Sequence, residues 1–362
     1  MIPIYQPYLP KKSVEYANEA IQSNWISSLG KYTFIAAEKL AEVTETKYCV
    51  LTNNGTSATH LVTKSLKKKY PNVKKIYVPS SCFVAAYNCL LYDNIGWEIE
   101  AVDLCNETWN ADYSSIEPEK NSAIMVVHNL GNIVDVLKLK EKFEVPIIED
   151  NCEGFFGKYR GHQSGSKSLA SSLSFFGNKN ITTGEGGAFL TNDEALYDYA
   201  NKIRGQGQTV KRYIHDDLGY NYRMTNVHAA ILLGQLESMD SVYDEKMRVF
   251  ERYKNNLKSK DGIELQSTED NTEHSMWMNG VKFNGLECYE DADKYFTSKG
   301  IETRPMFYPF DEQSHLRTIQ GPSENARNLS DRIVIFPSYP ELKNTEIDYI
   351  CSCILKFREE LE

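Results

Sequence analysis

The sequence predicts an α/β protein with a mostly parallel sheet, followed by a smaller α+β unit. Seven apolar runs recur in the first half of the chain with helical stretches between them, a pattern typical of a sheet that helices cover on both faces. They lie at 48–51, 75–78, 97–102, 123–127, 145–148, 172–176 and 187–190. After about residue 258 the pattern changes to short strands and amphipathic helices. We therefore expect a large domain over 1–245 and a small C-terminal domain over 246–362.

Local signals define the elements before the first predicted strand. Three prolines predict an extended N-terminal arm over 1–12. Ser13 is the expected N-cap of a first helix that ends near Ser23. A loop over 24–31 precedes a second helix, which is expected over about 33–44.

Two helices and a long loop follow the last predicted strand of the sheet. The stretch 193–257 predicts helix, loop and helix, and its loop over 205–223 is rich in glycine, tyrosine and charge. Asn226 is the expected cap of the second helix. The small domain is expected to contain strands at 276–283 and 301–305 and helices near 288–299 and 345–358.

Composition limits the classes of function. The chain has 362 residues, 41% of them hydrophobic and 25% charged, as in ordinary soluble proteins, and its net charge of −10 argues against a nucleic-acid partner. The 8 cysteines show no metal-ligand spacing, so we expect free thiols in the cytoplasm and no metal site. No signal peptide is evident and no apolar stretch is long enough for a membrane helix, so no membrane partner is expected.

One lysine stands in a glycine-rich loop between two predicted strands. Lys179 follows the run at 172–176, and glycine occupies three of the four positions 184–187. Such a loop holds its side chains at the end of a strand, where open α/β sheets bind ligands. A lysine that is partly desolvated there can lose its proton and attack a carbonyl to give a Schiff base. The alternative is a solvated loop lysine.

Three more segments follow predicted strands and suit pyridoxal 5'-phosphate (PLP), a cofactor that binds to such a lysine. Asp150 ends the strand run at 145–148 and can keep the pyridine nitrogen protonated. Gly55 and Thr56 leave a strand and open a helix, which makes an anion site. Phe83 can stack on the ring. Each also has an ordinary interpretation, as a helix cap, a plain turn or a core residue.

Seven motifs extend over nearly the whole chain. They lie at 25–28, 54–56, 148–150, 174–187, 204–208, 219–226 and 301–305. With them, the chain resembles the DegT/DnrJ/EryC1/StrS family of PLP-dependent sugar aminotransferases. The resemblance implies the fold type I architecture of aspartate aminotransferase, in which a seven-stranded, mostly parallel sheet contains one antiparallel strand.

The resemblance also implies a cofactor site with Lys179 as the catalytic residue. Asp150 would face the ring nitrogen, Glu153 would lie near the ring hydroxyl, and Ser174 would join the phosphate site. Asn221 would reach the phosphate from the neighbouring subunit, which implies a homodimer with shared active sites. The implied cofactor-binding residues are Gly55, Thr56, Ser57, Phe83, Asp150, Glu153, Ser174, Lys179 and Asn221.

Substrate contacts are implied for a second set of residues. They are Trp25, Ser27, His128, Arg223, Arg304 and His315. The guanidinium group of arginine suits phosphates and carboxylates, although both arginines could instead form surface ion pairs. His128 could instead be a packed residue at the end of a strand. Trp277 matches a family tryptophan, but core packing is the interpretation that we favour for it. Relatives carry small residues in place of Asn151 and Cys152, which leaves the substrate open.

The implied activity is the conversion of a nucleotide-linked 4-keto-6-deoxyhexose to a 4-amino-4,6-dideoxy sugar of the viosamine or perosamine type. L-Glutamate would donate the amino group and leave as 2-oxoglutarate, and the nucleotide would be UDP, GDP or dTDP. One alternative is a sugar 3-aminotransferase or a deoxysugar dehydratase of the same fold, although in those dehydratases histidine replaces the lysine at position 179. Another is a non-catalytic binding protein that keeps the fold.

Overall fold

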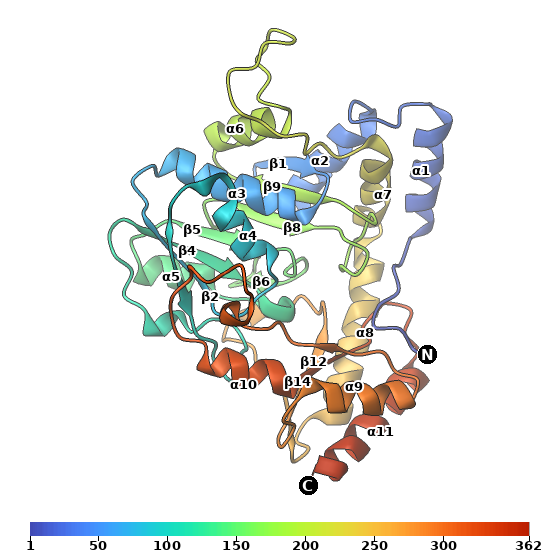
Figure 1. Ribbon diagram of the computed structural model, residues 1–362. Helices are drawn as coiled ribbons and strands as arrows, with labels where there is room; N and C mark the ends of the chain where they lie inside the picture. Colours follow the sequence, from blue (N-terminus) through green and yellow to red (C-terminus); the bar gives the residue numbers. More distant parts are fainter. Residues whose placement is uncertain (362) are drawn as a thin grey trace.

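The computed structural model describes residues 1–361 and contains a large sheet of seven strands (Figure 1). Its strands run in the order β1-β9-β8-β5-β4-β2-β3. Their bounds are β1 Tyr48–Thr52, β2 Lys75–Pro79, β3 Glu98–Val102, β4 Ser122–Val127, β5 Ile147–Asp150, β8 Ser171–Ser174 and β9 Gly187–Thr191. Strand β9 is antiparallel to both of its neighbours, whereas the other neighbouring strands are parallel. The expected seven-stranded sheet with one antiparallel strand is confirmed.

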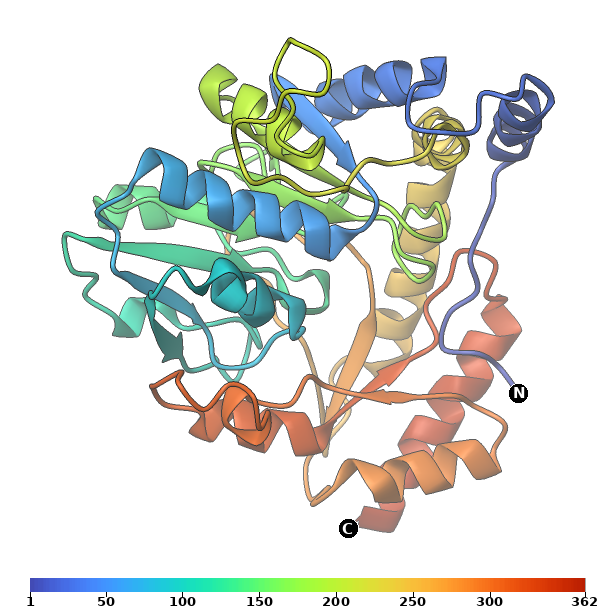
Figure 2. The same ribbon diagram turned by 45° about the horizontal axis from the view of Figure 1, so that its top comes forward.

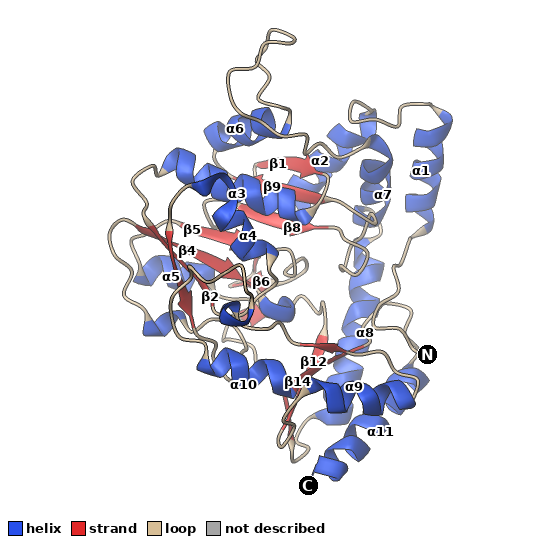
Figure 3. Ribbon diagram, in the orientation of Figure 1, coloured by secondary structure: helices blue, strands red, loops and turns tan. Residues whose placement is uncertain are grey.

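Helices cover both faces of this sheet (Figure 3). Side chains alternate along β1, so that Val50 packs with α3, α4 and α6, while Leu51 packs on the other face with α2 and α7. The helices of this part are α1 Lys11–Gln22, α2 Lys31–Val43, α3 Gly55–Lys69, α4 Ala85–Leu91, α5 Val136–Lys142, α6 Glu194–Arg204 and α7 Asn226–Leu236. No helix within residues 1–361 is both long and apolar enough to cross a bilayer.

A smaller antiparallel sheet lies beside the large one, in the order β10-β12-β14-β13. Its strands are β10 Ile263–Leu265, β12 Asn279–Phe283, β13 Arg304–Pro305 and β14 Ile333–Phe336, and its helices are α8 Met239–Leu257, α9 Tyr289–Ser298, α10 Glu324–Arg332 and α11 Asn344–Leu361. Helix α8 joins the two parts, because Val242 packs in a core of the large sheet and Val249 in the core of the small one. The predicted domain boundary at 245/246 therefore falls inside α8.

The N-terminal arm crosses from α1 to the small domain (Figures 1 and 2). Ile2 pairs with Ile301, and the Ile4 N–H donates to the Glu302 carboxylate at 2.9 Å. A third, short sheet is made by β6 Lys158–Tyr159, β7 His162–Gln163 and β11 Thr272–Glu273.

Two predicted helix caps are wrong. Helix α1 begins at Lys11 after Pro10, so Ser13 lies inside it, buried, with its hydroxyl donating to the Ile231 carbonyl of α7 at 3.0 Å. Thr225 rather than Asn226 caps α7, by accepting the His228 N–H. In both cases the side chain that was expected to cap the helix forms a hydrogen bond with a distant segment instead.

Candidate active site

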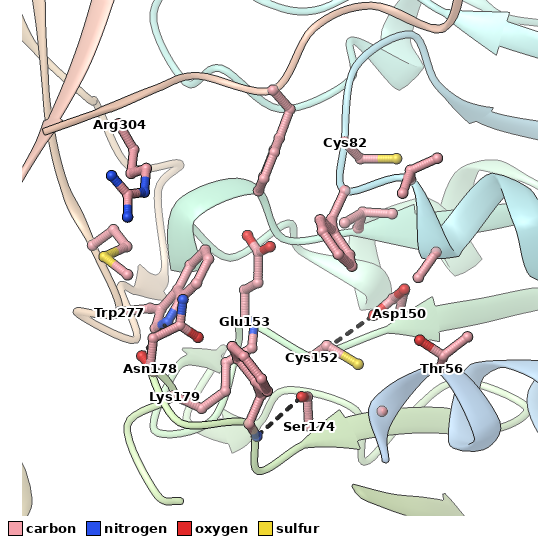
Figure 4. Close-up of a pocket in the computed structure, with 18 of the residues that line it drawn as sticks. Thr56, Cys82, Asp150, Cys152, Glu153, Ser174, Asn178, Lys179, Trp277 and Arg304 are labelled. Atoms are coloured by element: carbon pink, nitrogen blue, oxygen red, sulfur yellow. Dashed lines mark hydrogen bonds between the residues drawn. The ribbon is translucent and has the colours of Figure 1, made fainter. Parts of the chain in front are cut away.

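A cavity of about 1010 Å³ lies where the strands of the large sheet end against the small domain. It is lined by the segments that follow β1, β2, β5 and β8, together with residues of the small domain and of the N-terminal arm. Figure 4 shows Lys179 and Trp277 on one side of the cavity, Asp150 and Thr56 on the opposite side, and Glu153 between them. Open α/β sheets bind ligands at this edge.

Lys179 is held by contacts from three parts of the chain. Its backbone N–H donates to the Phe176 carbonyl at 2.9 Å, and its carbonyl accepts from the Tyr5 hydroxyl at 2.9 Å. Its amine nitrogen, Nζ, lies 3.9 Å from the ring centroid of Trp277. No carboxylate forms an ion pair with this amine among residues 1–361. The amine is therefore in the cavity and open to reaction with a carbonyl.

Asp150 supplies a buried negative charge to the cavity. It ends β5 and is 6% exposed. One carboxylate oxygen accepts the Cys152 N–H at 3.1 Å, and the other lies 3.4 Å from the Thr59 hydroxyl. Within the described chain no cation pairs with Asp150, so its charge is available to a ligand. Burial raises the pKa of the neighbouring Cys152 thiol well above its usual value, so this thiol stays neutral.

The start of α3 forms an anion cradle. The Asn54 side chain accepts the Ser57 N–H at 2.8 Å and caps the helix, so the N–H groups of Gly55 and Thr56 remain at the cavity edge. A Cβ added at Gly55 would lie 2.7 Å from the Cβ of Ser174, so only glycine allows this approach. Ser57 itself does not line the cavity. Helix N-termini of this kind bind phosphate groups.

Glu153 lines the cavity, and its carboxyl accepts the Leu130 N–H at 2.9 Å. Burial raises the pKa of this carboxyl to about 7, so it changes charge near neutral pH.

This burial predicts a pH-dependent effect of Glu153→Gln on stability. A carboxyl whose pKa is higher in the folded state destabilises that state once it ionises, so the penalty is absent well below pH 4.5 and complete above pH 7. Unfolding of the cofactor-free protein in urea should show a gain for the variant that is about 2–3 kcal/mol larger at pH 8 than at pH 5. An equal effect at both pH values would contradict the burial of this charge.

The remaining predicted residues divide into those inside the cavity and those outside it. Phe83 lines it and is 55% exposed, and Arg304 lines it while paired with Glu302. His128 is fully buried outside it: its Nε2 contacts Glu149 at 2.9 Å, and its Nδ1 accepts the Val134 N–H. His315 is exposed and contacts Asn88 at 2.9 Å instead.

Four predicted residues do not line this cavity. Trp25 and Ser27 stand in one exposed loop, whose carbonyls are bound by Asn226 at the start of α7. Asn221 and Arg223 precede the same helix, in a segment that pairs with the end of β1.

Several cavity residues were not anticipated from the sequence. Tyr5 and Asn178 line the cavity, and the buried Oδ1 of Asn178 has no hydrogen-bond partner in the described part of the chain. Trp277, for which we favoured core packing, contacts the Lys179 amine. Asn178 adjoins Lys179 in sequence, which is a signal that could have found it. Tyr5 lies in an extended arm whose position the sequence does not show.

The residues present fit PLP. The cradle at Gly55 and Thr56 suits its phosphate, the unpaired carboxylate of Asp150 suits its ring nitrogen, and the Lys179 amine stands across the cavity from both. The cavity is large enough to admit a substrate beside the cofactor.

Comparison with known proteins gives a consistent result. The model of the DegT/DnrJ/EryC1/StrS aminotransferase family matches residues 7–355. The chain is 38% identical to a GDP-perosamine synthase of Escherichia coli O157:H7, covering 98% of each protein, and 32% identical to a GDP-perosamine synthase of Vibrio cholerae, covering 99% of each. Among solved structures, Helicobacter pylori PseC, an aminotransferase involved in the biosynthesis of pseudoaminic acid, superposes with a TM-score of 0.91 at 22% identity, over 99% of each chain.

Proposed function

From the premise that the chain belongs to the DegT/DnrJ/EryC1/StrS aminotransferase family, we propose that it aminates C4 of a nucleotide-linked 4-keto-6-deoxyhexose. The protein is a PLP-dependent aminotransferase. We further propose L-glutamate as the amino donor and a GDP-linked sugar of the perosamine type as the product, because two GDP-perosamine synthases match it over nearly their full length.

The observation that carries the proposal is the Lys179 amine set across one cavity from the Asp150 carboxylate and the α3 cradle. Bound PLP supplies an aldehyde that an amine can attack and a ring that withdraws electrons from the donor α-carbon. Gly55, Thr56 and Ser174 would hold its phosphate, and Asp150 would keep a proton on its ring nitrogen. Lys179 would hold the cofactor and, once released, move a proton to and from the donor α-carbon.

A substrate panel tests this proposal. The PLP-loaded protein would be supplied with glutamate and with the 4-keto-6-deoxy sugars linked to GDP, UDP or dTDP, and 2-oxoglutarate and the sugar product would be measured. We expect turnover with the GDP sugar and an amino group at C4. An amino group at C3 would identify a 3-aminotransferase, and loss of a hydroxyl without net amination would identify a dehydratase. Cofactor binding without turnover on any sugar would contradict the catalytic proposal.

We also propose that two copies of the chain share their active sites. Trp25, Ser27, Asn221 and Arg223 lie outside the cavity of their own chain, on a surface rich in exposed apolar side chains. These side chains include Leu29 and Phe34 beside the first loop and Val210, Tyr213 and Leu218 in the projecting loop above α6 (Figure 1). Exposed apolar clusters of this kind mark protein interfaces, and a second copy would bring these residues to its partner's cavity.

Complementation tests the sharing. Chains carrying Lys179→Ala and chains carrying Asn221→Ala should each be inactive, and mixing them should restore about a quarter of the wild-type activity, because random exchange makes about half the dimers mixed and each mixed dimer has one intact site. Steady-state turnover after confirmed subunit exchange is the measurement. Failure to recover activity would show that each site is built within one chain.

A further inference from the structure

Trp277 makes two contacts with the segment that carries the reactive lysine. Its indole N–H donates to the Asn178 carbonyl at 2.8 Å, one residue before Lys179. Its ring face lies 3.9 Å from the Lys179 Nζ, in the geometry of a cation–π contact. Trp277 is 6% exposed and lines the cavity, so its ring forms a fixed part of the cavity wall. Figure 4 shows the two side chains next to each other.

A buried lysine fixes the backbone of Trp277 from behind. Lys246 of α8 is 1% exposed, and its amine donates to the Trp277 carbonyl at 2.9 Å and to the Ser338 carbonyl. The Ser338 hydroxyl donates to the same Trp277 carbonyl at 3.1 Å. Burial lowers the pKa of Lys246 to about 7, and a neutral amine still donates to both carbonyls. No carboxylate pairs with Lys246 in the described residues; besides these two carbonyls, its amine lies 5.2 Å from the ring centroid of Tyr5.

We propose that Trp277 is a positioning residue that holds the amine of Lys179 whenever this amine is not bonded to the cofactor, and that Lys246 fixes Trp277 in place. This inference rests on the proposed function, because a transaminase cycle releases the lysine from the cofactor and needs it again as a proton carrier. A lysine has a flexible four-carbon stem and loses its reach to the α-carbon if the amine swings into solvent. The indole face gives the released amine one resting place inside the cavity.

The position of the amine can be measured without turnover. Reductive ¹³C-methylation of the cofactor-free full chain labels its lysines, and Lys179→Ala identifies the signal of Lys179. We expect this signal to be shifted upfield by the ring current of Trp277, to join the signals of exposed lysines in Trp277→Leu, and to stay partly shifted in Trp277→Phe. Trp97→Phe is the matched control, because Trp97 is also buried and its indole nitrogen has no partner in the described chain.

Kinetics separate positioning from packing. In the loaded enzyme, Trp277→Leu should lower kcat about tenfold with the KM for glutamate within about twofold, because binding is unchanged and only the proton carrier is misplaced. Trp277→Phe keeps a flat ring and should retain kcat within about threefold. Lys246→Met should lower kcat in the same direction. Lys282→Met is its control, since Lys282 is also buried but pairs with Glu264 on the small sheet.

Two results would overturn the inference. One is a chemical shift of Lys179 in the wild-type protein that equals the shifts of the exposed lysines. This result does not depend on whether the Trp277 variants fold. The other is a kcat in Trp277→Leu, or in Trp277→Phe if the leucine variant does not fold, that falls only together with a raised KM. A wild-type protein that binds no PLP would instead contradict the proposed function, and the labelling result would distinguish the two failures.

Discussion

Lys179→Ala should abolish transamination and leave a folded protein. The side chain is half-buried in a loop after β8, and its amine lies over the Trp277 ring and forms no ion pair within residues 1–361, so its removal destabilises the core little. Its loss removes both the covalent hold on the cofactor and the group that moves the proton, and a general acid–base group alone contributes about 10²–10⁴-fold to the rate. Single-turnover rates with glutamate and the visible absorption band of the loaded protein are the measurements.

Lys299→Ala is the matched control for this experiment. Lys299 also lies over an aromatic ring, that of Tyr295 at 5.0 Å, but it does not line the cavity. It should keep wild-type rates. If Lys179→Ala retained turnover within about tenfold of wild type, Lys179 would not be the catalytic lysine.

Asp150→Asn should keep the cofactor bound and slow each half-reaction by about 10²-fold or more, which corresponds to about 3 kcal/mol of transition-state stabilisation. Asparagine keeps the shape and the acceptor for the Cys152 N–H but removes the negative charge. Without that charge the ring nitrogen of the bound cofactor holds its proton less firmly, and electrons are withdrawn less strongly from the α-carbon. Asp150→Glu should recover little, because the longer side chain would crowd the ring.

Asp135→Asn is the matched control for Asp150. Asp135 is also buried, but it caps α5 and pairs with Arg160 outside the cavity. Asparagine is a good helix cap, so this variant should be only slightly less stable than the wild type, and its catalytic rate should be unchanged. A near wild-type single-turnover rate for Asp150→Asn would assign the nitrogen partner elsewhere, and Glu153 would be the next residue to test.

The large sheet could be predicted because its strands are buried on both faces and read as apolar runs. The same sheet brings Asp150, Gly55 and Lys179 to one edge, since Asp150 ends a strand and the other two follow one. This part of the site could be expected from the order along the chain alone. Phe83 after β2 follows the same logic.

The rest depends on contacts between distant segments. Helix α10 and strand β14 were not predicted, because their short patterns gain meaning only when they pack in the small domain. His128 lies at the end of its strand as expected, yet its ring contacts Glu149 and does not face the cavity. A shift of one residue along the strand would move a side chain from one face of the sheet to the other. Trp277 packs in the core as we favoured, but its contact with the Lys179 amine joins two distant segments and could not be predicted from the sequence.

Helix α8 acts as a strut between the two walls of the cavity. It runs for 19 residues, contains neither glycine nor proline, and starts in the core of the large sheet and ends in that of the small one. Helices kink mainly at such residues. A rotation of the small domain relative to the large one would therefore have to bend this unbroken helix, which is about 28 Å long. The width of the cavity is therefore fixed when the chain folds. The N-terminal arm completes the wall with Ile4, Tyr5 and Pro7, and its contacts with Ile301, Glu302 and Lys179 fix it to both parts of the chain.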